Sequence, residues 1–324
     1  MDSRIGRKLA TRATAGFAGA AALVTALVAG YGSHGASDAA PQSAGNQAPT
    51  AKRPALGALP LTPTRGLAKG LALPLDEYVS SPLENYTWQV AVQDEWRTCM
   101  ARYGFEDFGP PRVDERTVAA QTNAALGRRY GLSDPVSAAE FGYHLPDDVP
   151  EPPHWEPAPG AETSVFTGKG AELEDGAYQG QTVPNGGCRE EVRRMLPPPV
   201  TPEALRLSLE SFDQAQERPE VVKAITEWSS CMKKKGYKRD HPLEDIDAPG
   251  ISISAPTPGA EEIEHAVADV ECKKETDLIG IWSSAERAEQ VEGIKKNSLK
   301  ISKEKAAKDR TANKARQMYE EGVR

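Results

Sequence analysis

The chain has 324 residues, enough for about two domains, and a formal net charge of −8. Hydrophobic residues make up 39% of it, below the usual globular share, which favours small cores joined by long polar segments. Residues 295–316 carry nine Lys or Arg against two acidic residues, so the rest of the chain is strongly acidic, which argues against a nucleic acid partner.

Residues 1–40 have the form of an export signal. A basic stretch (residues 4–12) precedes an apolar run (residues 17–30), and small residues follow. The apolar run is short and rich in alanine, which favours a cleaved signal over a retained N-terminal anchor. Tyr31 stands where a lipoprotein signal has its cysteine, so lipidation is unsupported. The sequence therefore predicts an exported protein, either extracellular or tethered on the outer face of a membrane.

Proline-rich residues 41–75 predict a disordered tether, and a first helical module is expected over residues 76–199. Within this module, residues 145–186 are rich in proline, glycine and acidic side chains and predict a long acidic loop. Gly104 is the expected C-cap of the first helix and Asp134 the expected N-cap of the third. The expected helices cover residues 76–103, 113–129, 135–143 and 188–196.

Residues 200–324 form a second predicted module. Helices are expected over residues 202–216 and 219–236, followed by a loop, and one long helix from residue 260 to about 319. The apolar stripe of the long helix weakens after Ile294, so its last part is expected to be a charged, solvated rod. Strand signals are sparse. The predicted fold class is all-α, with two disulfide-clipped helical modules and long disordered connections rich in Pro and Gly.

The four cysteines lie in near-duplicate contexts. Residues 95–105 and 227–237 share Glu, Trp, Cys, Met and Gly at equivalent positions, and one further cysteine follows in each half. Outside the cytoplasm an even number of cysteines favours disulfides. Of the three pairings that four cysteines allow, the repeat favours one bond per module, with four free thiols or a zinc site as weaker alternatives. The favoured pairs are Cys99–Cys188 and Cys231–Cys272.

Four segments carry a resemblance to a known group of proteins. They are Trp-Ser-Ser-Cys-Met-x-x-x-Gly-Tyr (residues 228–237), residues 266–282, Arg-Tyr-Gly-Leu-Ser-Asp-Pro (129–135) and Phe-Gly-Tyr-His (141–144). Together they resemble exported actinobacterial proteins of unknown function, often described as hypothetical or lipoprotein-like, some of them associated with envelope transport systems. The resemblance covers residues 76–300. It implies an envelope location and transfers no activity or catalytic residue.

The sequence offers no catalytic residue, metal ligand or cofactor site. A phosphate loop, a dinucleotide fingerprint and a nucleophile elbow are all missing. Glu261, His265 and Asp269 follow one another at i, i+4 and i+8 on the predicted long helix. Such a row spans about 12 Å, too far for one ion, so a solvated helix face is expected there.

Two groups of residues are candidates for binding. Aromatic side chains of the first module could line a groove for a peptide, glycan or lipid, with ordinary core packing as the alternative. The groove candidates are Trp88, Trp96, Tyr103 and Tyr143. The start of the basic tail could contact an anionic envelope polymer or phospholipid headgroups, an electrostatic and salt-sensitive contact because no apolar face accompanies it. The contact candidates are Lys295, Lys296, Lys300 and Lys303.

These observations favour an exported, envelope-associated interaction or accessory protein without catalysis. Its expected partners are an envelope protein or an anionic envelope polymer, and membrane contact is expected only through an uncleaved N-terminus. A module that binds a small ligand, glycan or lipid through the aromatic first half is the first alternative. A hydrolytic enzyme of unrecognised type is the second.

Overall fold

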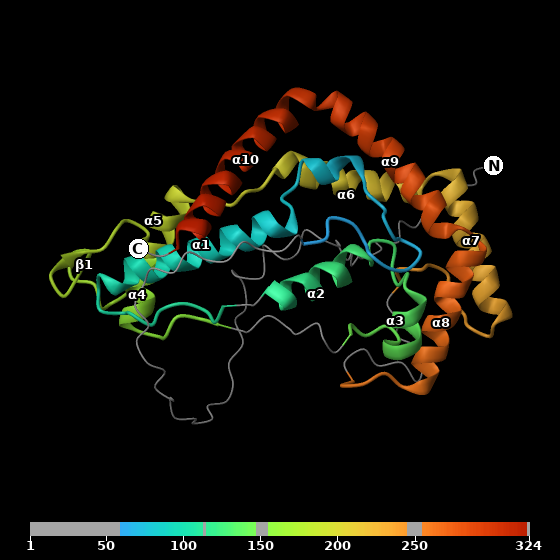
Figure 1. Ribbon diagram of the computed structural model, residues 1–324, viewed down its shortest axis with the longest axis horizontal. Coiled ribbons are helices and arrows are strands. Elements are labelled where there is room, and N and C mark those ends of the chain that lie inside the picture. Colours follow the sequence, from blue (N-terminus) through green and yellow to red (C-terminus); the bar gives the residue numbers. More distant parts are fainter. Residues whose placement is uncertain (1–58, 113–114, 147–154, 245–254, 323–324) are drawn as a thin grey trace, which may run out of the picture.

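The computed structural model describes residues 59–112, 115–146, 155–244 and 255–322, and the folded body is built from helices (Figure 1). The predicted export signal and most of the predicted tether lie outside the described residues. The elements in chain order are η2 (Pro74–Glu77, a 3-10 helix), α1 (Pro82–Ala101), α2 (Glu115–Leu126), α3 (Pro135–Phe141), α4 (Ala161–Thr167), β1 (Ala177–Tyr178), β2 (Gln181–Thr182), α5 (Gly187–Met195), α6 (Pro202–Gln216), α7 (Pro219–Lys234), α8 (Ala260–Glu275), α9 (Leu278–Lys296) and α10 (Ser298–Glu321).

Local sequence fixes both ends of α1. The Ser81 hydroxyl accepts a hydrogen bond from Glu84 N at 3.2 Å, while the Glu84 carboxylate accepts one from Ser81 N at 2.7 Å, which is a capping box. At the other end, Gly104 has φ +87 and Phe105 N donates to Met100 O. Glycine adopts this left-handed conformation without a steric penalty. The expected cap at Gly104 is therefore confirmed, and so is Asp134 as the N-cap of α3.

Helices from the two sequence halves pack against each other. α10 lies along α1 and the short α3 along α8, while α6 packs along α9 within the second half. In Figure 1, α8, α9 and α10 follow one another along the outer edge of the molecule, and α10 returns to the first half. The two predicted modules thus share long contacts.

The two disulfides join the pairs that the repeat favours. Cys99 of α1 is bonded to Cys188 of α5, and Cys231 of α7 to Cys272 of α8, with a Cα–Cα distance of 5.7 Å in both. Each disulfide lies inside its own hydrophobic cluster. The predicted pairing is confirmed, and all four cysteines are used.

The prediction of one continuous helix from residue 260 is wrong. Three helices cover this stretch, because Asp277 adopts a left-handed conformation with φ +48 and Asn297 ends α9. The expected solvated rod is wrong as well. Ile301, Ala312 and Ala315 of α10 are buried. Small alanine side chains let the backbones of two helices approach closely, a signal that a count of large apolar residues misses.

The predicted acidic loop over residues 145–186 contains structure. It holds α4 and the hairpin β1–β2, in which Ala177 pairs with Thr182 and Tyr178 with Gln181. Gln179 and Gly180 both have positive φ, as a type I′ turn requires.

The end of the predicted tether is also ordered. Leu67 N donates to Ser133 O at 2.9 Å, and Ala68 and Leu73 are buried.

Candidate functional site

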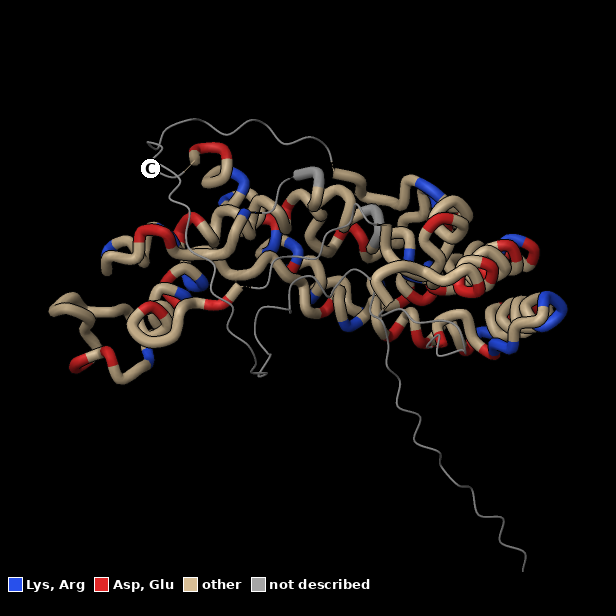
Figure 2. The backbone as a smooth tube through the Cα atoms, turned by 90° about the horizontal axis from the view of Figure 1, so that it is seen from below, with Lys and Arg blue, Asp and Glu red and all other residues tan. Residues whose placement is uncertain are grey.

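The junction of α9 and α10 gathers the four lysines that the sequence singled out. Asn297 makes the turn there, since its side-chain amide donates to Gly293 O at 2.9 Å and its carbonyl accepts from Ile301 N at 3.0 Å. Residues 295–303 contain four lysines and no acidic residue, and we call this segment the lysine corner. The two helices meet at an angle at the top of Figure 1. A second basic run, residues 233–239, lies at and after the end of α7, and acidic and basic positions are interspersed along the other helices (Figure 2).

Some of the cations on this side of the molecule are neutralised by the fold. Lys300 is ion-paired with Glu203 of α6. Hydrogen bonds from Arg206 and Lys300 lower the pKa of Glu203 to about 2, so this carboxylate stays ionised. Lys308 points inward and pairs with Glu84 of α1 at 3.2 Å. These pairs attach α10 to α6 and α1.

Other lysines at the corner have no such partner. Lys295, Lys296 and Lys303 are exposed, and no carboxylate in the described part of the chain lies within ion-pair distance of them. Their charges add to a local positive potential, because no described carboxylate is ion-paired with them. The corner therefore presents three uncompensated cations, while Lys300 serves mainly to hold the helix.

The lysine corner also carries an apolar side chain that sequence reasoning missed. Leu299 is 89% exposed, the highest value among the exposed large hydrophobic residues of the described chain. Ile301, two residues later, is fully buried against Leu75, Ala204 and Leu207. Burial of Ile301 fixes the rotation of the first turn of α10 and holds Leu299 outward. The electrostatic contact expected from sequence thus gains an apolar component.

A second cluster of charged residues is buried between α3, α7 and α8. Asp269 is fully buried, and its carboxylate accepts hydrogen bonds from Trp228 Nε1 at 2.9 Å and Lys273 Nζ at 3.1 Å. Lys273 Nζ also donates to Leu132 O at 2.9 Å. Burial lowers the pKa of Lys273, while Asp269 acts in the opposite direction. With its partners satisfied and no exposure, this pair holds helices together.

The two first-half segments that carry the resemblance, residues 129–135 and 141–144, contact buried residues of α8 and α9. In the segment 129–135, Arg129 pairs with the buried Glu286 of α9, and Gly131 leaves room for Lys273, since a Cβ there would lie 2.8 Å from Lys273 Nζ. In the segment 141–144, His144 Nδ1 lies 2.8 Å from Glu262 Oε1. The motifs therefore have a structural role, which is to dock α3 and its flanks on α8 and α9.

The solvated face expected for Glu261, His265 and Asp269 is wrong for two of them. Glu261 is exposed, but His265 is 3% exposed and Asp269 is fully buried. Both ring nitrogens of His265 are buried, and no described residue forms a hydrogen bond with them. Its ring packs against those of Tyr143 and Tyr237. No group of three or more metal-ligating side chains is found among the described residues.

Three of the four groove candidates lie in connected clusters. Trp96 packs with Tyr103 around the first disulfide and with Trp88 in a second cluster, and Trp88 Nε1 donates to Leu196 O at 3.3 Å. Tyr143 lies in a different cluster, where its hydroxyl is 3.4 Å from Asp269 Oδ2. The observed contacts of these aromatic residues are core contacts.

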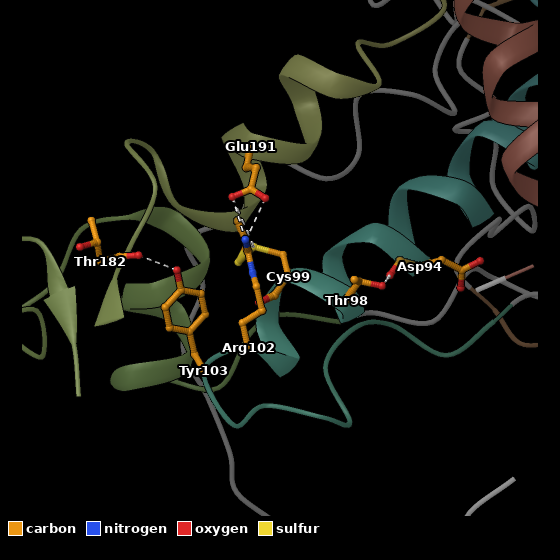
Figure 3. Close-up of a disulfide and its surroundings, with 8 residues drawn as sticks. Asp94, Thr98, Cys99, Arg102, Tyr103, Thr182 and Glu191 are labelled. Atoms are coloured by element: carbon orange, nitrogen blue, oxygen red, sulfur yellow. Dashed lines mark hydrogen bonds and ion pairs between the residues drawn. A yellow bond between two sulfur atoms is a disulfide. The ribbon is translucent and has the colours of Figure 1, made fainter. Parts of the chain in front are cut away.

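The first disulfide lies beside an ion pair (Figure 3). Arg102 Nη2 donates to both carboxylate oxygens of Glu191 at 2.8 Å and to Cys99 Sγ at 2.7 Å. The Tyr103 hydroxyl donates to Thr182 O at 2.8 Å. These contacts connect α1, the hairpin and α5 around the Cys99–Cys188 bond.

A groove of about 280 Å³ lies between α1 and the end of α10. Its wall is made by Ala91, Asp94, Glu95, Thr98, Met318, Glu321 and Gly322. Asp94 is paired with Arg97 and Arg112. Burial, and then the neighbouring Asp94, raise the pKa of Glu95. Three of the residues that line the groove are therefore acidic, namely Asp94, Glu95 and Glu321.

No described helix is both long enough and apolar enough to cross a membrane. No protein-family model, curated protein or solved structure matches the chain. The resemblance to exported actinobacterial proteins stays a prediction.

Proposed function

We propose that this chain is an exported interaction protein of the cell envelope, without a catalytic role, that contacts an anionic partner through the lysine corner. Both disulfides are formed, and such bonds persist in oxidising compartments outside the cytoplasm. The export-like residues 1–40 agree with this location.

The observation that carries the proposal is the division of the lysines at the corner. Lys300 and Lys308 are paired with carboxylates, whereas Lys295, Lys296 and Lys303 are exposed without one in the described chain. A partner that supplies negative charge would complete these interactions. Exposed cations grouped at the corner would orient an otherwise acidic chain toward such a partner.

Cell fractionation tests the proposal. A C-terminally tagged chain, expressed in the native cells, is expected in the envelope or outside the cell and accessible to protease added to intact cells. Extraction with salt is expected to release it if the partner is anionic. A matched chain without residues 1–40 serves as the control and should stay inside. A full-length chain that remains protease-protected in the cytosol would contradict the proposal.

A further inference from the structure

We propose that the lysine corner is a docking surface for an anionic phospholipid bilayer, with Leu299 entering the interface between headgroups and acyl chains. The inference rests on the proposed function, because only an exported chain faces the outer surface of a membrane. It adds to that function a specific partner and an apolar contact.

The structure holds Leu299 in a position from which it can insert. The side chain is 89% exposed at the first turn of α10, next to the bend at Asn297. Ile301 on the opposite side is fully buried, and Lys300 is tied to Glu203. An isolated exposed leucine is ordinary in a soluble protein. This one lies at an outer corner of the fold, beside cations that lack partners.

Charge and apolar exposure coincide on the same helical face. Leu299 and Lys303 are separated by four positions in α10, so their side chains project on one side. Lys295 and Lys296 end α9 just before the bend and are exposed. Each lysine near an anionic lipid surface improves binding about fivefold, which corresponds to ~1 kcal/mol. Three of them would contribute about a hundredfold.

A bilayer fits this surface better than a soluble anionic polymer does. A polymer would use only the charges and would leave Leu299 in water. A bilayer offers phosphate groups to Lys295, Lys296 and Lys303 and an apolar layer a few ångströms deeper for the leucine. The contact surface is also an outward corner, which can approach a flat membrane without rearrangement.

Vesicle sedimentation tests the inference with the full chain and its disulfides intact. The probes are phosphatidylcholine vesicles with and without phosphatidylglycerol. The variant carrying Lys295→Glu, Lys296→Glu and Lys303→Glu is expected to bind anionic vesicles more than about a hundredfold more weakly, because each change removes a positive charge and adds a negative one. The matched control carries Lys233→Glu, Lys234→Glu and Lys238→Glu, three exposed lysines at the end of α7, and is expected to bind like the parent. Equal losses in both variants would overturn the inference.

A second pair of variants separates a bilayer from a polymer. Leu299→Ser is expected to weaken binding about fivefold, and the loss should persist at high salt because apolar insertion is not screened. Leu209→Ser, a change at a 53% exposed leucine of α6, is the control and should have no effect. If Leu299→Ser binds normally and soluble polyphosphate displaces the parent completely, the contact is purely electrostatic and the bilayer inference is wrong.

Lysine acylation reports on the corner itself, even if the apolar N-terminal segment also binds the vesicles. Anionic vesicles are expected to protect Lys295 and Lys296 from a water-soluble acylating reagent and to leave Lys233 and Lys234 reactive. Unchanged labelling of Lys295 and Lys296 on bound protein would overturn the inference. Cytosolic location in native cells, by contrast, would contradict the proposed function and leave the measured lipid contact standing.

Discussion

The indole nitrogen of Trp228 donates a hydrogen bond to the carboxylate of Asp269 at 2.9 Å, and both side chains are fully buried. Trp96 occupies the equivalent position of the sequence repeat, yet its buried indole nitrogen has no hydrogen-bond partner among the described residues. The two halves thus share the Trp and Cys positions of the repeat but differ in whether the indole nitrogen has a hydrogen-bond partner among the described residues. The charged centre at Asp269 lies in the second half, and it receives α3 from the first half.

Lys273→Met is expected to destabilise the protein strongly. The substitution leaves the buried carboxylate of Asp269 without its cation, which typically costs about 3–5 kcal/mol. Lys274→Met, a change at the exposed neighbour, should stay within about 0.5 kcal/mol of the parent. Denaturant unfolding of both variants measures the difference. Similar stabilities for the two variants would show that the pair contributes little.

His265→Phe is expected to stabilise the fold, increasingly so as the pH falls. Burial, with Arg239 nearby, lowers the pKa of His265 below its ordinary value of about 6.5. The unfolded chain therefore binds the proton more readily, and stability is lost as the pH falls below about 6.5. Phenylalanine fills a similar space between two tyrosine rings and has no unpaired nitrogen.

Thermal unfolding across this pH range measures the effect. The difference in melting temperature between His265→Phe and the parent should widen toward acid pH. A constant or shrinking difference would contradict neutral burial of the imidazole.

Removal of either disulfide is expected to destabilise the protein by a similar amount. The bonds close loops with sequence separations of 89 and 41 residues. Chain entropy predicts losses of about 4.5 and 4 kcal/mol when each cysteine pair is replaced by alanine. Urea unfolding of the two double variants, compared with the parent with both disulfides intact, provides the measurement. A loss below about 1 kcal/mol for either bond would contradict its structural role.

Ala315→Glu is expected to detach α10 from α1 and lower stability by several kcal/mol. Ala315 is fully buried in a cluster with Ala91 and Val92, where a carboxylate would have no partner. Asn313→Glu adds the same charge at an exposed position of the same helix and should be nearly neutral. Circular dichroism melting curves separate the two. Equal melting temperatures for the two variants would indicate that this part of α10 is solvated, as the sequence predicted.

Local patterns predicted much of the helical structure and both disulfides. Proline at the first helical position marks α6 and α7, and the repeat around Cys99 and Cys231 gives the pairing. These features depend on residues close in sequence or on direct internal similarity. They could therefore be inferred without knowledge of how the helices pack.

Burial that depends on distant segments could not be predicted. His265 and Asp269 look like one polar helix face until α3 covers them with Tyr143. Leu299 falls on an apparently continuous helix, but the bend at Asn297 changes which residues face inward. The lysines were found because charge runs are visible in sequence, whereas their division into paired and unpaired residues requires Glu203 and Glu84 from other helices.

We propose that the folded chain lies outside the cytoplasm with both disulfides formed. Trapping of free thiols in native cells, followed by non-reducing peptide mapping, tests this proposal. We expect that no cysteine is labelled before reduction and that Cys99 is recovered joined to Cys188 and Cys231 to Cys272. Cytosolic protein with labelled cysteines, or a peptide that joins Cys99 to Cys231, would contradict it.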